Sequence, residues 1–238
     1  MKKFFNTTLV IGSLLFVAAL SSCQKDQSMK SNKVLPDVNS TNLSSSIGNI
    51  AEIDVSLGDS VYYWTKSGTV SSGTFTNSTA YRTPISYSLP TGKTPNDVIA
   101  IAIASNNYCY YWYSNGTVSV GYTNNATAHS LPVAFTCAPG ETPTTILAIS
   151  IAKTSNNVYT WYKDGTATVG TYTNLASIRS AYPFSPASGK LVSDVVGIGI
   201  AGSNDHTWVW YNDGTTKSVS SGYTNTFDAY SGAVSASF

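Results

Sequence analysis

At 238 residues the chain can hold one large all-β domain or two small ones. Only 11% of its residues are charged and its formal net charge is +1, while Ser, Thr, Asn, Gly and Tyr are abundant. This composition favours an extracellular β-protein over a cytosolic helical enzyme. Because the sequence lacks the basic stripe that phosphate neutralisation requires, it also excludes nucleic acid as a partner.

The first 22 residues have the pattern of a secretory signal and are set aside from the fold. Lys2 and Lys3 form a positive start, and residues 9–20 form an apolar stretch that is too short for a comfortable membrane span. The segment ends in Leu20-Ser21-Ser22-Cys23, which resembles the lipoprotein box of bacteria. We therefore expect Cys23 to carry lipid at the mature N-terminus; the alternative is an ordinary signal followed by a chance cysteine.

Residues 23–46 comprise this cysteine and a predicted tether. The segment is rich in Ser, Asn and Lys and shows no hydrophobic period, which is typical of a flexible linker. Its first residues do not resemble an inner-membrane retention signal. The sequence therefore predicts a lipoprotein of the bacterial outer membrane, displayed at the cell surface and held to the membrane by its N-terminal anchor only.

Residues 47–238 contain four copies of one unit, each marked by a Trp that is followed four residues later by Gly-Thr. The spacings between successive tryptophans are 48, 49 and 49 residues, too regular to arise by chance. The four marks are Trp64 with Gly68-Thr69, Trp112 with Gly116-Thr117, Trp161 with Gly165-Thr166, and Trp210 with Gly214-Thr215.

Each copy has the pattern of short strands separated by turns. The first strand is apolar with small alternate residues, as at 101–104, 149–152 and 198–201, with 50–53 as a degenerate first copy. A polar turn and the Trp-bearing strand follow. The next turn is Ser-Gly, Asn-Gly or Asp-Gly, and the last two pairs are strong hairpin signals because a type I′ turn needs positive φ at both central positions. A third strand, as at 117–122, and a less regular fourth, as at 81–89, complete the unit.

Three or four antiparallel strands in a repeat of about 48 residues are typical of a β-propeller blade. One blade cannot bury both faces of its sheet, so neighbours must stack. The array begins at a first strand and ends after a fourth, which predicts four whole blades. Four is the lower limit of the usual range, and this leaves open a larger ring built by two chains, hence a homo-oligomer.

The Trp-bearing strand places two aromatic side chains on one face in every copy, because side chains alternate along a strand. Two interpretations are open: the rings fill the space between blades, or some of them reach a groove between blades and stack on a sugar. The pairs are Tyr62 with Trp64, Tyr110 with Trp112, Tyr159 with Trp161, and Trp208 with Trp210.

Two polar patterns also recur, and each can be ordinary turn and surface chemistry or the lining of a pocket for a neutral, hydroxylated ligand. In the first, an Asn is followed five residues later by a basic or aromatic residue: Asn77 with Arg82, Asn124 with His129, Asn174 with Arg179, and Asn225 with Tyr230. The second lies in the turn after the first strand: Asn106, Asn107, Asn156, Asn157, Asn204, Asp205 and His206.

Three segments, at 87–95, 158–166 and 196–206, resemble the repeats of the PLL-like bangle lectins, and the likeness covers residues 47–238. The resemblance implies a propeller that binds fucose and related sugars between its blades. The chain departs from that family in having four repeats instead of seven, and in having Leu57-Gly58-Asp59 where later copies carry Ser-Asn-Asn or Ser-Asn-Asp. The leading hypothesis is a carbohydrate-binding propeller; the alternative is a scaffold for protein interaction or adhesion.

The sequence gives little support for catalysis. A glycosidase needs two carboxylates about 5–10 Å apart, but Asp164 and Asp213 occupy equivalent turns of different copies. Glu52, Asp54 and Asp59 cluster without repeating, which we interpret as a degenerate first blade. The sequence has no nucleophile elbow and no Gly-rich phosphate loop, so we expect a protein that is not an enzyme.

Metal and cofactor sites are not predicted either. The two histidines are isolated and no calcium-loop spacing occurs. Beyond Cys23 the chain has Cys109 and Cys137, both in the second copy, and in an oxidising compartment they can form one disulfide.

Overall fold

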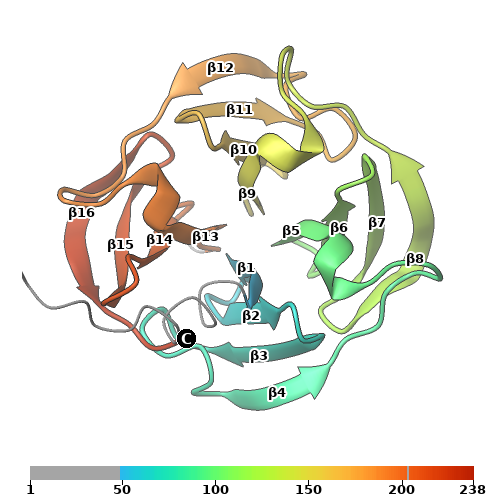
Figure 1. Cartoon of the computed structure of the whole chain (residues 1–238), viewed down its shortest axis with the longest axis horizontal. Helices are drawn as coiled ribbons and strands as arrows, with labels where there is room; N and C mark the ends of the chain where they lie inside the picture. Colours follow the sequence, from blue (N-terminus) through green and yellow to red (C-terminus); the bar gives the residue numbers. More distant parts are fainter. Residues whose placement is uncertain (1–48, 203) are drawn as a thin grey trace, which may run out of the picture. The chain divides into compact units, whose positions relative to one another are not determined.

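Four antiparallel sheets, each of four strands, surround one axis in the computed structural model, which describes residues 49–202 and 204–238 (Figure 1). Blade 1 is β1 (Ile50–Val55), β2 (Val61–Thr65), β3 (Thr69–Gly73) and β4 (Arg82–Ser86). Blade 2 is β5 (Val98–Ile103), β6 (Cys109–Tyr113), β7 (Thr117–Tyr122) and β8 (Asn125–Ala134). Blade 3 is β9 (Ile146–Ile151), β10 (Val158–Tyr162), β11 (Thr166–Gly170) and β12 (Arg179–Pro183). Blade 4 is β13 (Val195–Ile200), β14 (Thr207–Asn212), β15 (Lys217–Tyr223) and β16 (Thr226–Ser235).

The strands of each blade follow one another from the axis to the rim, so β1, β5, β9 and β13 are innermost (Figure 1). The prediction of an all-β propeller with four whole blades is therefore confirmed. The predicted signal segment, Cys23 and the tether lie outside the described residues. No helix in the described part of the chain is long and apolar enough to cross a membrane.

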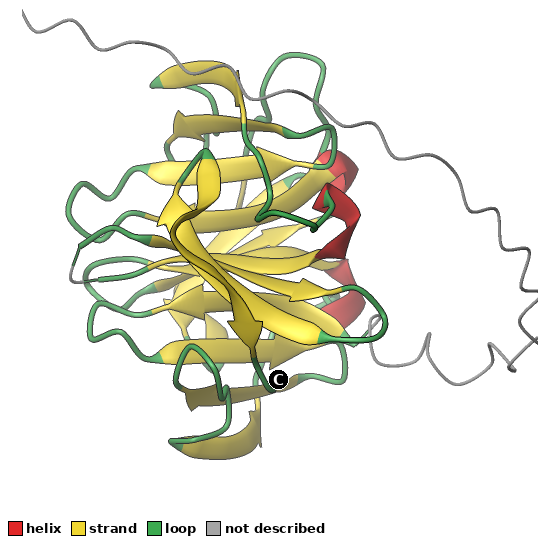
Figure 2. Cartoon of the chain, turned by 90° about the vertical axis from the view of Figure 1, so that its left-hand side faces the viewer, coloured by secondary structure: helices red, strands yellow, loops and turns green. Residues whose placement is uncertain are grey.

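Short 3-10 helices precede the innermost strands of blades 2, 3 and 4, at Pro95–Asp97, Pro143–Thr145 and Val192–Asp194. All three lie on one side of the propeller, which we call the helix face (Figure 2). The loops that join first to second strands, and third to fourth strands, lie on the opposite side, which we call the loop face. The two faces carry different candidate sites.

Large and small side chains of the innermost strands complement each other at three of the four seams, while β1 presents Glu52 and Asp54 to blade 2. Ile149 and Ile151 of β9, for example, share a buried cluster with Ala100 and Ala102 of β5. On β13 the residues that face blade 1 are glycines, and a Cβ on Gly197 would lie 2.7 Å from the Cβ of Ile53. Alternation of isoleucine with Ala or Gly thus lets the four inner strands approach closely around a narrow axis.

The repeated tryptophans fasten each blade to the next one. Each indole is at most 1% exposed, and its Nε1–H donates a hydrogen bond to a backbone carbonyl in the third loop of the following blade. The pairs are Trp64 with Thr123 at 2.8 Å, Trp112 with Tyr172 at 3.1 Å, Trp161 with Thr224 at 3.0 Å, and Trp210 with Phe75 at 2.9 Å. The last pair joins blade 4 to blade 1.

A parallel bridge between backbones accompanies each indole contact. A residue two positions after the fourth strand pairs with a residue in the loop before the fourth strand of the next blade or at the start of that strand. The pairs are Ser88 with Asn125, Thr136 with Asn174, Ser185 with Thr226, and Ser237 with Asn77. The C-terminal segment therefore repeats at blade 1 what each earlier linker does at its own seam. The ring closes within one chain.

Replacing Ser237 by Pro tests this closure. The Ser237 N–H donates to the carbonyl of Thr76 at 2.8 Å, and proline removes that donor. We expect Ser237→Pro to lower the free energy of unfolding by about 0.5–1.5 kcal/mol, because the seam loses one backbone hydrogen bond. Chemical denaturation provides the measurement.

The matched control is Ser237→Ala, which keeps the N–H and loses only the hydroxyl that lies 3.3 Å from the Thr76 carbonyl. Equal stability of the two variants would show that the C-terminal bridge does not hold the ring closed.

Candidate functional site

Two grooves open on the loop face at successive seams, one between blades 1 and 2 and one between blades 2 and 3. Groove 1–2 has a volume of about 420 Å³ and includes Tyr62, Asn107, Tyr122 and Thr123. Groove 2–3 has a volume of about 310 Å³ and includes Asn106, Tyr110, Asn156, Thr171 and Tyr172. Both volumes suit a small ligand.

The two grooves are built from equivalent positions. The inner wall ends in Ile103 or Ile151, the last residue of β5 or β9. Tyr62 and Tyr110 each stand two residues before the seam Trp on the second strand, and each ring stacks on that indole at a centroid distance of 5.9 Å. The buried indole thereby fixes the orientation of a tyrosine whose other side borders the groove.

An asparagine with positive φ contributes an amide to each groove: Asn107 at 62° in groove 1–2 and Asn156 at 57° in groove 2–3. Asn is among the few non-glycine residues that adopt this left-handed conformation readily. The Oδ1 of Asn156 accepts a hydrogen bond from the Ser105 hydroxyl of the preceding blade at 2.8 Å. This bond orients the amide across the seam.

Aromatic rings close the outer side of groove 2–3. The Tyr172 ring lies 4.9 Å from that of Tyr110, tilted by 41°, and is 41% exposed. Burial raises the pKa of Tyr110, with a further contribution from Tyr172. The Tyr110 phenol is therefore a protonated hydrogen-bond donor at neutral pH.

The residue that bonds the seam Trp also sets how far each groove is open. Groove 1–2 has Thr123 at this position where groove 2–3 has Tyr172. At the seam between blades 4 and 1 the residue is Phe75, and its ring stacks on Trp208 at 3.9 Å with an interplanar angle of 19°. Trp208 is the equivalent of Tyr62 and Tyr110, so Phe75 fills the space that the two grooves leave open.

None of the residues that line the two grooves carries a formal charge. The linings consist of phenol rings, side-chain amides, hydroxyls and a few aliphatic side chains. Such a surface can stack on a flat apolar face and exchange hydrogen bonds with neutral polar groups. It offers neither an ion pair to a charged ligand nor a carboxylate for acid–base chemistry.

The predicted aromatic residues fall into two groups. Tyr110 lines groove 2–3, while Tyr159 is half-buried and stacks on Trp161. Trp112, Trp161 and Trp210 are at most 1% exposed in the seams and line neither groove. Their indoles fill the space between blades, as the first of the two interpretations proposed.

The predicted Asn pattern is shifted by one residue in blades 2 and 4. The parallel bridges make Asn77 equivalent to Asn125, Asn174 and Thr226, so Asn124 and Asn225 belong to the neighbouring position. The side chains of Asn77 and Asn125 each accept a hydrogen bond from the backbone N–H two residues later at 3.1 Å. Asn174 makes the same contact with Ala176 at 3.4 Å. These asparagines shape turns.

The basic residues of that pattern lie on the outermost strands and outside both grooves. Arg82 is exposed on β4, and the guanidinium of Arg179 on β12 lies over the Tyr182 ring at 3.9 Å. In the strand register, Arg82 and Arg179 correspond to Ser130 and Ser231, not to His129 and Tyr230. Arg82 and Arg179 therefore have no basic counterpart in blades 2 and 4.

His129 and Tyr230 instead belong to two exposed aromatic clusters on alternate blades. His129 stacks on Tyr108 at 3.9 Å, and Tyr230 stacks on His206 at 3.9 Å. A tyrosine at the end of the third strand, Tyr122 or Tyr223, completes each cluster. Tyr122 also lines groove 1–2, so the first cluster continues that groove outward.

The turn residues of blade 4 form contacts between blades. Asp205 has φ of 52° and accepts hydrogen bonds from the Lys153 N–H at 3.0 Å and from the Thr154 hydroxyl. Asn204 accepts from the His206 N–H at 3.0 Å within its own turn. Asp59 repeats the contact between blades by accepting from the Gly202 N–H at 2.8 Å. These side chains hold neighbouring loops together.

Cys109 and Cys137 are free, so the disulfide that the sequence left possible is not formed. Cys109 is buried in the cluster between blades 1 and 2, whereas Cys137 packs against the cluster between blades 2 and 3. One sheet separates the two thiols. Burial raises the pKa of Cys137 to about 11 and that of Cys109 further, which keeps both protonated.

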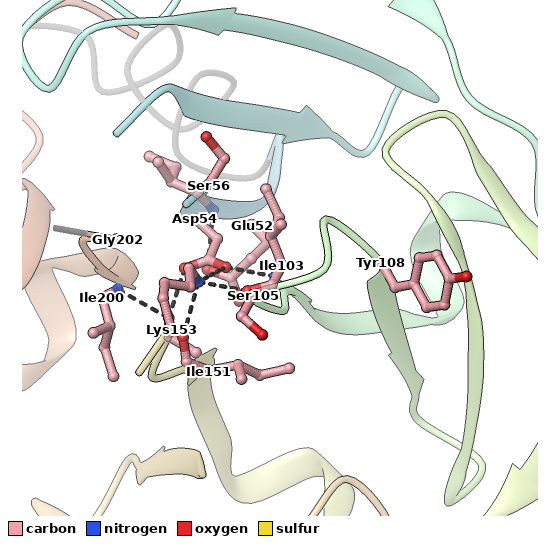
Figure 3. A network of polar contacts seen from close by, with 12 residues as sticks. Glu52, Asp54, Ser56, Ile103, Ser105, Tyr108, Ile151, Lys153, Ile200 and Gly202 are labelled. Carbon is pink, nitrogen blue, oxygen red and sulfur yellow. Dashed lines mark hydrogen bonds and ion pairs between the residues drawn. The ribbon is translucent and has the colours of Figure 1, made fainter. Parts of the chain in front are cut away.

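A polar network occupies the axis beneath the grooves and joins all four blades (Figure 3). Asp54 of β1 accepts from the Ile103 N–H of β5 at 2.7 Å and from the Ser150 hydroxyl of β9 at 2.6 Å. The Ser150 oxygen in turn accepts from the Ile200 N–H of β13 at 2.9 Å. Sequence reasoning gave Asp54 no role, because only the first copy carries it.

Lys153 neutralises this network from the loop after β9. Its ammonium lies 3.5 Å from the Asp54 carboxylate and donates to the carbonyls of Ile103 and Ile151. Lys153, Asp54 and the nearby Glu52 are at most 3% exposed. These groups are buried, so the ion pair of Asp54 and Lys153 serves the structure.

Glu52 is buried on the same strand, and its Oε1 accepts from the Ile53 N–H at 2.9 Å. Burial raises the pKa of Glu52 well above its ordinary value, outweighing the backbone donors that surround it. Desolvation thus favours the uncharged carboxylic acid.

No protein-family model matches the chain, and no curated protein matches its sequence. Solved structures that resemble it include U3-55K, at 11% identity and a TM-score of 0.34 over 72% of this chain and 48% of that chain. The WD40 repeats of RRP9 are 12% identical, with a TM-score of 0.34 over 72% of this chain and 47% of that chain. PorZ is an essential bacterial surface component of the type-IX secretion system of Porphyromonas gingivalis. It is 14% identical, with a TM-score of 0.39 over 80% of this chain and 26% of that chain. The chain spans less than half of each of these structures, and likenesses this distant carry no argument about function.

Replacing Glu52 by Gln tests the electrostatics of the axis. Between the ordinary pKa of 4.5 and the raised pKa of the folded state, the native chain holds a proton that the unfolded chain has released. Stability therefore falls as pH rises through this window. Gln keeps the acceptor for Ile53 and removes the titration, so we expect Glu52→Gln to be more stable at neutral pH by on the order of 1 kcal/mol.

Urea denaturation across this pH range, with Glu141→Gln as a control outside the axis, measures the difference. We expect a flatter dependence of the unfolding free energy on pH in Glu52→Gln than in the other two proteins. Parallel curves for all three would contradict the buried, protonated state of Glu52.

Proposed function

We propose that the chain is a lectin-like propeller that binds carbohydrate in grooves 1–2 and 2–3 and does not catalyse. The observation that carries the proposal is the shared, uncharged lining of the two grooves: a tyrosine ring fixed on a buried indole beside an asparagine amide. Aromatic rings stack on the C–H face of a sugar, and amide and hydroxyl groups satisfy its hydroxyls. The likeness of the repeats to bangle lectins supports the same ligand class, with fucose-type glycans as the first candidates.

Two grooves at adjacent seams also suit a multivalent ligand. Each groove is small and open, so an individual site is expected to be weak. Two weak sites on one rigid ring reinforce each other on a surface that displays many glycans, because the second contact becomes intramolecular. A scaffold without a sugar site has no need for two matched, uncharged grooves.

The proposal places this ring on the bacterial cell surface, attached to the outer membrane by lipid at Cys23. The sequence Leu20-Ser21-Ser22-Cys23 supports the anchor, and residues 24–46 supply the predicted tether. A tethered binding ring is a plausible means of holding glycans at the surface, since the tether allows the grooves to reorient.

Removing one exposed ring from each groove tests sugar binding. Tyr122 and Tyr172 are 47% and 41% exposed, so their replacement leaves the seam cores intact. We expect Tyr122→Ala with Tyr172→Ala to weaken binding of the best sugar from a glycan panel, fucose included, about ten-fold through loss of ring contacts. Calorimetric titration of the mature chain gives the affinity.

Tyr223→Ala is the matched control, because Tyr223 is the equivalent of Tyr122 on blade 4 and is outside both grooves. Absence of millimolar binding to any sugar of the panel would reject the lectin proposal and favour the scaffold.

Cys23→Ser tests the anchor. The variant lacks the thiol that a lipoprotein transferase modifies, so we expect loss of labelling by a fatty-acid analogue and release of the chain from the membrane fraction. Cys137→Ser is the control, since it retains Cys23. Equal labelling of both variants would show that Cys23 is not the site of lipid attachment.

A further inference from the structure

A depression of about 620 Å³ lies at the centre of the helix face, on the side opposite to the two grooves. We call it the central mouth. It is bordered by the first residues of all four innermost strands and by the 3-10 helices of blades 2, 3 and 4, which face the viewer in Figure 1. Its position on the axis makes it distinct from every seam.

The wall of the central mouth combines a set of apolar side chains with the polar residues Asn96, Thr144 and Ser193. Four equivalent residues, one from each blade, are half-exposed there: Ala51, Ile99, Leu147 and Val196. Each of them directly precedes a residue of its innermost strand that is packed between blades, so the backbone of the propeller core also holds the wall. A concave surface with half-exposed aliphatic side chains favours an apolar ligand body.

Two lysines on opposite blades add positive charge to this wall. Lys66 of blade 1 donates to the Val98 carbonyl at 2.7 Å, and Lys163 of blade 3 donates to the Thr144 carbonyl at 2.7 Å. One carbonyl uses one of the three N–H donors of an ammonium, so each lysine keeps donors for a ligand. Within residues 49–202 and 204–238 neither lysine lies within ion-pair distance of a carboxylate.

The lysines are not required by the fold. The equivalent positions in blades 2 and 4, also two residues after the seam Trp, are Ser114 and Asn212. Moreover, no acidic residue lines the mouth, and the nearest buried carboxyl along β1, that of Glu52, is held in its uncharged form by burial. Burial lowers the pKa of Lys66, and Asp97 on the adjoining 3-10 helix partly offsets its charge. Lys163 is exposed and lies within ion-pair distance of no carboxylate in the described residues, so its charge is available to an anion.

We propose that the central mouth binds a small amphiphilic anion, with its apolar body against Ile99, Leu147 and Val196 and its anionic head on Lys66 or Lys163. A carboxylate on an alkyl or aryl body is the simplest ligand of this class. The uncharged grooves of the loop face suit a neutral ligand, whereas the mouth combines apolar wall and positive charge. The two proposals therefore concern separate faces and separate chemistries.

Octanoate is the probe, titrated into the full chain carrying Cys23→Ser so that no attached lipid competes. We expect saturable binding of octanoate and much weaker binding of acetate, which lacks the body, and of octylammonium, which reverses the charge. Lys66→Gln and Lys163→Gln together should weaken octanoate binding about ten-fold, as expected for loss of a charge-assisted hydrogen bond. Lys190→Gln, outside the mouth, should leave it unchanged.

Leu147→Glu should abolish octanoate binding by placing a carboxylate in the wall, whereas Leu131→Glu, at a rim residue that is 79% exposed, should not. Equal affinity for octanoate and acetate, equal affinity for octanoate and octylammonium, or octanoate affinity unchanged by Leu147→Glu would each overturn the proposal. Sugar titrations of the lysine variants separate the two sites, because they should match the parent chain whatever octanoate does.

Discussion

The inner edges of β1, β5, β9 and β13 impose the constraint on which this propeller depends. Each of these strands has a partner on one side only, and its other edge faces the axis, where Ile103, Ile151 and Ile200 are at most 2% exposed. Buried backbone groups without partners are costly. Asp54, Ser150 and Lys153 supply partners to Ile103, Ile151 and Ile200, so side chains complete what a further strand would provide.

Such a solution needs unequal blades. If all four copies placed Ala or Gly beside the axis, the inner edges would have no partners; if all four placed Asp there, like charges would meet in a dry space. One acidic residue, one lysine and one serine satisfy the edges with little net charge. The departure of Asp54 from the repeat, which the sequence suggested was degeneration, therefore supplies partners to the inner edges of the other blades.

The fold was predictable because periodic Trp and Gly-Thr signals act locally, through hairpins and through one contact per seam. The site was predictable only in part. Tyr110 and Asn156 were found because they recur at the right phase, whereas Tyr172 was missed because its equivalents are Thr123, Thr224 and Phe75. Trp112 was assigned to the binding site because strand alternation places it on the same face as Tyr110. Alternation does not tell which of the two rings is buried in the seam and which borders the groove. The Asn pattern slipped by one residue because a turn has no period to fix its register.

In a closed ring of repeats, binding sites are expected at positions whose residue type is not fixed by packing between the blades. The seam tryptophans and the bridging loops have the same role in every blade. Away from the axis, two positions differ between blades: the residue beside the seam indole, which is Thr123, Tyr172 or Phe75, and the residue two after the Trp, where lysine alternates with Ser114 and Asn212. Because packing does not explain these differences, ligands of two chemistries on two faces are the more economical account.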